Sequence, residues 1–131
     1  MSDTMENDSC YRAAYLGALL ARHYPQARPH MIGRAIYGMQ KAARAAKAWE
    51  EKRCNVPLTE RQEEAGNARI RKLAVALNET LADLDDRPVD QNGKATDHAT
   101  VTLGGDPRGP CARLHMPGQH GDGFGEGFAI Y

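Results

Sequence analysis

A short loop carries the residues that are best suited to bind an anion. Residues 104–109 read GGDPRG, in which glycines allow positive φ angles and Pro107 fixes a turn, so that Arg108 is held at the tip. Backbone N–H groups beside a guanidinium suit a phosphate, and Asp106 can orient Arg108 or accept a hydrogen bond from a ribose hydroxyl. The alternative is a tight hairpin in which the side chains of Asp106 and Arg108 pair with each other and bind no ligand. The loop lacks the GKS or GKT of a Walker motif.

A second glycine-rich segment presents an aromatic side chain. Residues 118–127 read GQHGDGFGEG, so Phe124 has little bulk around it and could stack on a base, an interaction worth about 1–3 kcal/mol. Asp122, in the same segment, is counted with the ligand-binding candidates. The alternative for Phe124 is a core position, since the chain has few aromatic residues.

The strands predicted around the first loop alternate apolar and polar residues. The inner face is expected to hold Val101, Leu103, Ala112, Leu114 and Met116, and the outer face Thr100, Thr102, Cys111, Arg113 and His115. A sheet of three short strands cannot bury both faces by itself. Arg113 and His115 are therefore candidates for contact with a ligand or another subunit.

Metal binding and catalysis are not expected. Cys111, His115, His120 and Asp122 lie close in sequence, but their spacing is not that of a zinc motif. Cys111 and His115 are four residues apart on one strand, about 13 Å, which is too far for a nucleophile and its base. No carboxylate cluster typical of nucleases is present, and Cys111 is interpreted as a small, half-buried strand residue. We expect no cofactor.

The composition limits the classes of partner and the cellular location. The 131 residues fit one domain, and 17 basic against 17 acidic side chains give zero formal charge. Bulk charge therefore makes nucleic acid an unlikely partner. No apolar run suits a membrane span and residues 1–9 do not resemble a signal peptide, so a cytoplasmic protein with reduced thiols is expected. With two Phe, five Tyr and one Trp, the core is short of aromatic area, which favours a homo-oligomer.

Three helices should position these residues. The first is expected from Asp8 or Ser9 to Tyr24, before Pro25 and Pro29, with Tyr15, Ala18, Leu19 and Arg22 at helical spacing. The third should span residues 60–84, beginning with a capping box at residues 59–62 after Pro57. Its leucine-rich stripe should lie against the second helix and comprises Ile70, Leu73, Leu77, Leu81 and Leu84.

The second helix, expected over residues 30–53, has two distinct faces. Its core face comprises Ile32, Ala35, Ile36, Met39, Ala46 and Trp49. The opposite side is a basic stripe of Arg34, Tyr37, Lys41, Arg44 and Lys52, within a region (residues 10–53) of nine basic and two acidic residues, net +7. A stripe of this kind is usually a solvated surface, and the alternative is a surface that faces a polyanion.

These elements predict one α+β domain over residues 1–131. A long N-terminal helical hairpin (residues 8–84) precedes a flexible linker (85–98) and a small antiparallel sheet with glycine-rich loops (99–131). The linker has one aliphatic residue, Val89, and several turn formers, which indicates no packed element. Strands are expected at residues 100–103, 111–116 and 128–131.

The chain also resembles a family of small phage proteins. The resemblance covers roughly residues 41–131 apart from the linker, and its motifs are Cys54-Asn55, Leu58-Thr59, an Arg-rich third helix, the GDPRG turn at 105–109 and a terminal Gly-aromatic-Gly segment before Ile130-Tyr131. Among proteins of that architecture the chain looks most like the first family of Thoeris anti-defence proteins, which are sponges for the cyclic ADP-ribose signal of host TIR-domain enzymes. Asp122 and Phe124 stand where Asn and Trp are more usual, and residues 85–98 look like an insertion.

The resemblance implies a non-catalytic binder of a cyclic nucleotide in the infected bacterial cell, with pockets between subunits. The residues suited to that ligand are Arg108 for phosphate, Asp106 for ribose, Phe124 and Asp122, and Arg113, with Arg34, Lys41 and Arg44 closing the site. The alternative is a phage inhibitor or regulator, comparable to anti-CRISPR proteins, that binds a host defence protein or nucleic acid directly through the basic stripe.

Overall fold

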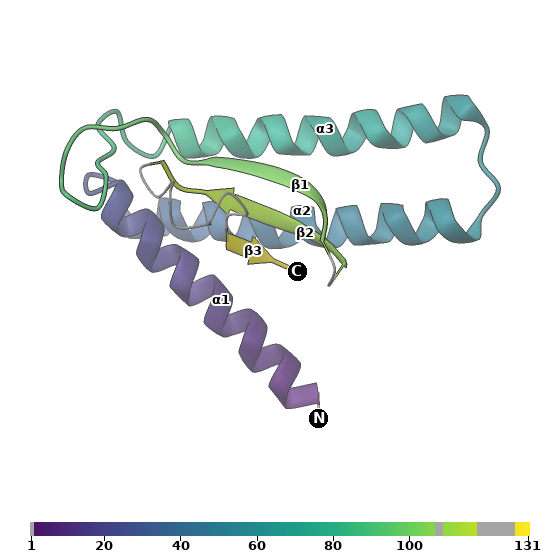
Figure 1. The fold of residues 1–131 in the computed structure, drawn as a ribbon, viewed down its shortest axis with the longest axis horizontal. Helices are drawn as coiled ribbons and strands as arrows, with labels where there is room; N and C mark the ends of the chain where they lie inside the picture. Colours follow the sequence, from purple (N-terminus) through teal and green to yellow (C-terminus); the bar gives the residue numbers. More distant parts are fainter. Residues whose placement is uncertain (1, 107–108, 118–127) are drawn as a thin grey trace.

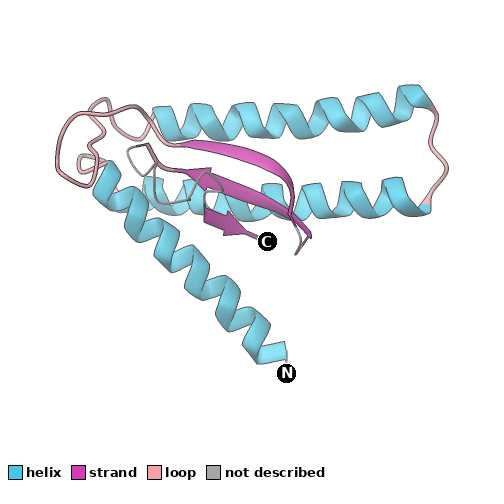
Figure 2. Ribbon diagram, in the orientation of Figure 1, coloured by secondary structure: helices cyan, strands magenta, loops and turns pink. Residues whose placement is uncertain are grey.

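The computed structural model contains three helices followed by a three-stranded antiparallel sheet (Figures 1 and 2), which confirms the predicted α+β class. It describes residues 2–106, 109–117 and 128–131, without the side chains of 2–9 and 106. The elements are α1 (Ser2–His23), α2 (Pro29–Asn55), α3 (Glu60–Ala82), β1 (Thr100–Asp106), β2 (Gly109–His115) and β3 (Phe128–Ile130), and the strand order is β1-β2-β3. No described helix has an apolar stretch long enough to cross a lipid bilayer.

Local signals place the ends of α2 and α3 close to the predicted positions. Pro29 occupies the first turn of α2, where its fixed φ angle suits the helix. The predicted capping box of α3 is confirmed: the Gln62 N–H donates to Thr59 Oγ1 (3.1 Å), and the Thr59 N–H donates to Gln62 Oε1 (3.0 Å). In contrast, α1 begins at Ser2, six or seven residues earlier than expected, and α3 ends at Ala82, two residues before the predicted end. The two long helices form the predicted helical hairpin (Figure 1).

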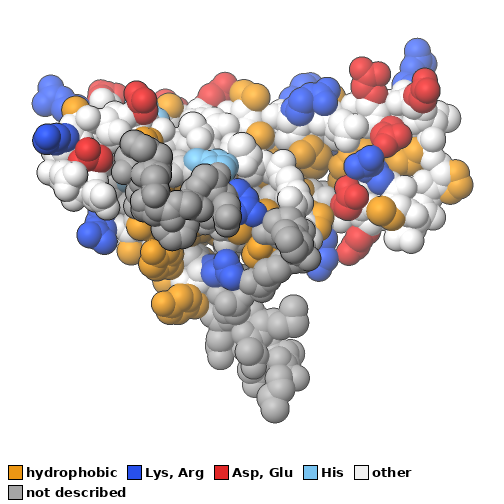
Figure 3. Space-filling model, viewed as in Figure 1, with side chains coloured by type: hydrophobic (Ala, Val, Ile, Leu, Met, Phe, Trp, Pro, Cys, Tyr) orange, Lys and Arg blue, Asp and Glu red, His pale blue; other side chains and the backbone are white. Residues whose placement is uncertain are grey.

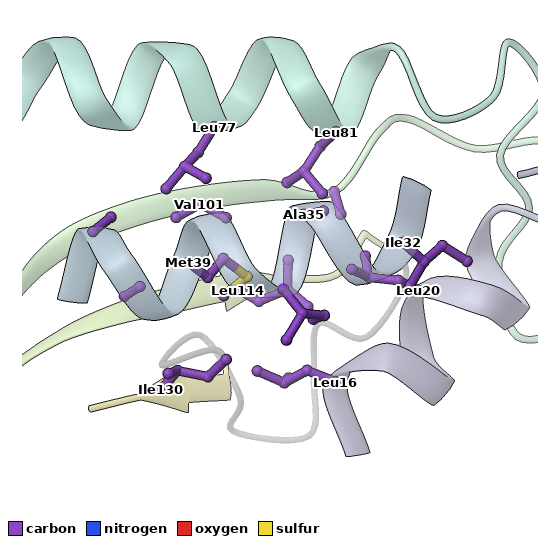
Figure 4. Close-up of a cluster of buried hydrophobic side chains, with 14 of the residues drawn as sticks. Leu16, Leu20, Ile32, Ala35, Met39, Leu77, Leu81, Val101, Leu114 and Ile130 are labelled. Atoms are coloured by element: carbon purple, nitrogen blue, oxygen red, sulfur yellow. The ribbon is translucent and has the colours of Figure 1, made fainter. Parts of the chain in front are cut away.

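The core lies where the inner face of the sheet meets α1, α2 and α3 (Figure 4). The close-up shows side chains from every element pointing into it: Leu16, Leu20, Ile32, Ala35, Met39, Leu77, Leu81, Val101, Leu114 and Ile130. The predicted core face of α2 is confirmed, although Trp49 is only partly buried. On α1 the buried side chains are Leu16, Leu20 and Tyr24, whereas Tyr15, one of the residues noted at helical spacing, is 48% exposed. Two neighbouring stripes of α1 carry apolar residues, one with Tyr15 and Leu19 and the other with Leu16 and Leu20. The periodicity of the helix therefore does not decide which stripe is buried.

The sheet is attached to α3 through its edge strand. Asn78 of α3 meets Val101 of β1: the Val101 N–H donates to Asn78 Oδ1 (2.7 Å), and Asn78 Nδ2 donates to the Val101 carbonyl (3.1 Å). The side-chain amide thus makes the two hydrogen bonds that a further strand would make with this edge. Val101, Ala112 and Leu114 are buried on the inner face, as predicted.

The segment 85–98 is packed, so its interpretation as an unpacked linker was wrong. The buried carboxylate of Asp85 accepts hydrogen bonds from the N–H groups of Gln26 (2.9 Å) and Arg87 (2.8 Å). The Val89 N–H donates to the His23 carbonyl, and His23 Nδ1 lies 2.8 Å from the Val89 carbonyl. These polar contacts attach the segment to the end of α1 and the loop after it, together with the burial of Pro88 and a ring contact between His98 and Tyr24. A polar composition therefore did not indicate the packing.

The His23 side chain makes the stability depend on pH. His23 is buried, its Nε2 has no hydrogen-bond partner among the described residues, and burial lowers its pKa below the ordinary value. The unfolded chain therefore takes up a proton first, at about pH 6.5, and stability present above that pH is lost as the pH falls through it. The melting temperature is expected to fall on acidification from about pH 7.5 to 5.5.

The matched variant is His23→Asn, because an asparagine amide can still donate to the Val89 carbonyl but does not titrate. The acid-induced fall in melting temperature should become smaller in this variant. His115, whose pKa is lowered first by burial and then by the Arg113 charge, leaves a residual effect of the same sign. An unchanged pH profile in His23→Asn would contradict the assignment.

Candidate ligand-binding site

Half of the predicted site residues fall where no side chain is described. Arg108, Asp122 and Phe124 lie outside the described residues, and Asp106 ends β1 with its side chain not described. The roles predicted for these four side chains stay predictions. The other four, Arg34, Lys41, Arg44 and Arg113, have defined positions.

One chain does not bring these four cations together. Arg34, Lys41 and Arg44 are exposed on α2, on the side opposite the apolar stripe that packs against the sheet. Arg113 lies on the outer face of the sheet, in register with Thr102 of β1. The body of α2 and the sheet therefore separate Arg113 from the basic stripe within a single protomer.

The outer face of the sheet is more closed than expected. Thr102 Oγ1 lies 2.9 Å from His115 Nε2, a hydrogen bond whose donor depends on the histidine tautomer. Cys111 is 1% exposed, so its interpretation as half-buried was wrong. Burial, and secondarily the Arg113 charge, lowers the pKa of His115. The His115 side chain is therefore neutral near neutral pH.

A cavity of about 620 Å³ lies between α2, α3 and the β1–β2 hairpin. We call it the hairpin pocket. Its lining comprises Ala46, Trp49, Glu50 and Arg53 of α2, Asn67, Ile70 and Arg71 of α3, and Leu103, Gly104, Gly105, Gly109 and Pro110 of the hairpin. Figure 3 shows acidic and basic side chains gathered at the right of the view, over the end of the helical hairpin where α2 leads into α3. Glycines on both sides of the predicted anion-binding turn thus border a cavity large enough for a small-molecule ligand.

The indole of Trp49 is held in the wall of this pocket by α3. Gly66 is buried directly against the ring, where an added Cβ would overlap Cη2, Cζ2 and Cζ3 of Trp49. The indole N–H donates to Asn67 Oδ1 at 3.0 Å. Close contact on one side and a hydrogen bond at the nitrogen fix the ring orientation, so a flat rigid surface borders the cavity.

The two arginines of the pocket differ in their partners. Arg53 donates to Glu63 Oε1 (2.9 Å) and Glu50 Oε2 (3.2 Å), and the Glu63 hydrogen bond is the main reason that its pKa is raised. Arg71 is exposed and has no ion pair or hydrogen bond with any residue that the structure describes. Arg71 therefore keeps its hydrogen-bonding capacity for a bound anion, whereas Arg53 is compensated internally.

Sequence reasoning assigned Trp49 to the core and did not select Arg71 or Asn67. The Arg-rich character of the third helix was noted, but only the packing of α2 on α3 identifies which arginine faces the hairpin. The sequence offered one tryptophan and a glycine within the predicted third helix, and only the structure shows that the two are in contact. Compared with known proteins, the chain matches no family, no curated protein and no solved structure.

Proposed function

We propose that this protein binds an anionic nucleotide in the hairpin pocket and sequesters it without chemical change. The observation that carries the proposal is the position of the pocket, which borders both ends of the turn that contains Arg108. Its volume of about 620 Å³ suits a nucleotide-sized ligand. Trp49 supports the proposal as a stacking surface for a base, and Arg71 as a cation for a phosphate.

The proposed ligand class is a cyclic nucleotide of the cyclic ADP-ribose type, as in the phage anti-defence family that the sequence resembles. In this proposal Arg108 and Asp106 act from the turn, on the phosphate and the ribose. A second copy of the chain is part of the proposal. The small aromatic content of the chain, two Phe, five Tyr and one Trp, supports further burial in a homo-oligomer.

Trp49 provides a direct test, because it is the single tryptophan of the chain and lines the pocket. Titration with cyclic ADP-ribose isomers is expected to quench its fluorescence, with the same affinity by calorimetry. Linear ADP-ribose serves as the comparison ligand. Calorimetric binding without any change at Trp49 would place the ligand elsewhere, and no binding of any isomer would contradict the ligand class.

Sequestration and hydrolysis are separated by the fate of the ligand. After incubation and heat denaturation of the protein, a sequestered ligand is released intact and is detected by mass spectrometry. A cleaved product that accumulates with time would contradict the non-catalytic proposal.

A further inference from the structure

We infer that the exposed face of α2 is a second binding surface, which takes the backbone of a single-stranded nucleic acid. We call it the basic face, and it comprises Arg34, Tyr37, Lys41, Arg44 and Lys52, all exposed. It lies on the other side of α2 from the apolar stripe that packs against the sheet. These cations therefore do not border the hairpin pocket, and the inference does not depend on the function proposed for that pocket.

The zero net charge of the chain conceals a strong separation of charge. From residue 28 to residue 49 the sequence has five arginines and lysines and no aspartate or glutamate; Glu50 and Glu51 come only afterwards. The zero net charge of the whole chain therefore does not exclude nucleic acid from this surface. A local excess of cations on one helix face creates a positive potential even on a neutral protein.

The cations of the basic face are not neutralised by carboxylates within the described part of the chain. Arg34, Lys41 and Arg44 make no ion pair with any carboxylate among the described residues, in contrast to Arg53 at the end of α2. Along the helix axis Arg34 lies about 10 Å from Lys41, and Lys41 about 4.5 Å from Arg44. A ligand that contacts all three must be long and repeatedly charged, as a polynucleotide is, because a single small anion cannot span them.

An exposed aromatic ring lies among these cations. Tyr37 is 58% exposed, and Lys41 Nζ lies 5.4 Å from the centroid of its ring. An aromatic ring beside cations is the arrangement that binds an unpaired base next to its phosphate. A lipid surface fits less well, because the apolar stripe of α2 is buried in the core and is not free to insert. An unpaired strand is therefore the partner that the observations favour.

The test measures binding of a labelled single-stranded DNA oligonucleotide, by fluorescence anisotropy, over a range of salt concentrations. The logarithm of the association constant should fall linearly with the logarithm of the salt concentration, with a slope of about −0.7 for each phosphate contact. The triple variant Arg34→Gln, Lys41→Gln, Arg44→Gln should lose about 2 in slope, since three contacts are removed and glutamine preserves the helix. Tyr37→Ala should weaken binding about 10-fold through lost stacking.

The matched control changes the same charge on another face: Arg61→Gln, Arg69→Gln, Lys72→Gln, all exposed on α3. This control should retain most of the affinity, and Arg71→Ala should bind the strand as the wild type does. Equal losses in both triple variants would overturn the inference, because bulk charge would then explain the binding. It would also be overturned if duplex DNA, polyglutamate or anionic phospholipid vesicles bound as tightly as the single strand at the same salt, or if no binding occurred.

Discussion

Gly66→Ala is expected to lower the free energy of unfolding by about 1–3 kcal/mol, the usual cost of overpacking a close contact. The added methyl group would overlap three ring atoms of Trp49. The indole is rigid and Gly66 belongs to a helix backbone, so the overlap can be relieved only by moving the ring or by separating α2 from α3. Either change breaks the hydrogen bond from Trp49 to Asn67 and alters the hairpin pocket.

Urea denaturation followed by circular dichroism measures this loss, and a red shift of the native tryptophan emission reports the displaced ring. The matched control is Gly33→Ala on α2, where an added Cβ meets no atom within 4 Å. That control should gain about 0.5–1 kcal/mol, because alanine is the better helix former. A Gly66→Ala variant as stable as Gly33→Ala would contradict the close packing of Trp49 on α3.

The overlap can also be isolated with a double-mutant cycle. Gly66→Ala combined with Trp49→Leu should cost less than the sum of the two single substitutions, because the smaller side chain leaves room for the methyl group. Additive costs would mean that Gly66 acts through something other than Trp49.

Arg71→Ala is expected to raise the dissociation constant of the nucleotide ligand about 10- to 100-fold. A hydrogen bond between charged groups contributes about 1.5–3 kcal/mol, and each 1.4 kcal/mol is tenfold in affinity. Because Arg71 is exposed and unpaired among the described residues, the free energy of unfolding should change little. Calorimetry with the ligand that the wild-type protein binds measures the dissociation constant, and urea denaturation measures the free energy of unfolding.

Arg69→Ala is the matched control for Arg71, since it removes the same charge from an exposed position of α3 that does not line the pocket. It should bind the ligand as tightly as the wild type. Equal affinity losses in the two variants would assign the effect to overall charge. Unchanged affinity in Arg71→Ala would remove Arg71 from the proposed site.

Local chemistry in the sequence determined the elements of this fold. Pro29 and the Thr59–Gln62 capping box set helix starts within one residue of the predicted positions. The alternation through Val101, Ala112 and Leu114 predicted the inner face of the sheet correctly. These features depend on residues a few positions apart, whose steric and hydrogen-bonding preferences act before any tertiary contact forms.

Tertiary structure decided the features that require two distant segments. Periodicity left two apolar stripes on α1, and packing against the rest of the core buried the one with Leu16 and Leu20. The polar composition of residues 85–98 predicted no packing, yet their hydrogen bonds with the end of α1 and the loop after it hold them in place. The hairpin pocket needs Trp49, Arg71 and Gly105 from three separate elements. Their proximity depends on how helices and sheet pack in space, and a spacing rule along one chain segment does not contain that information.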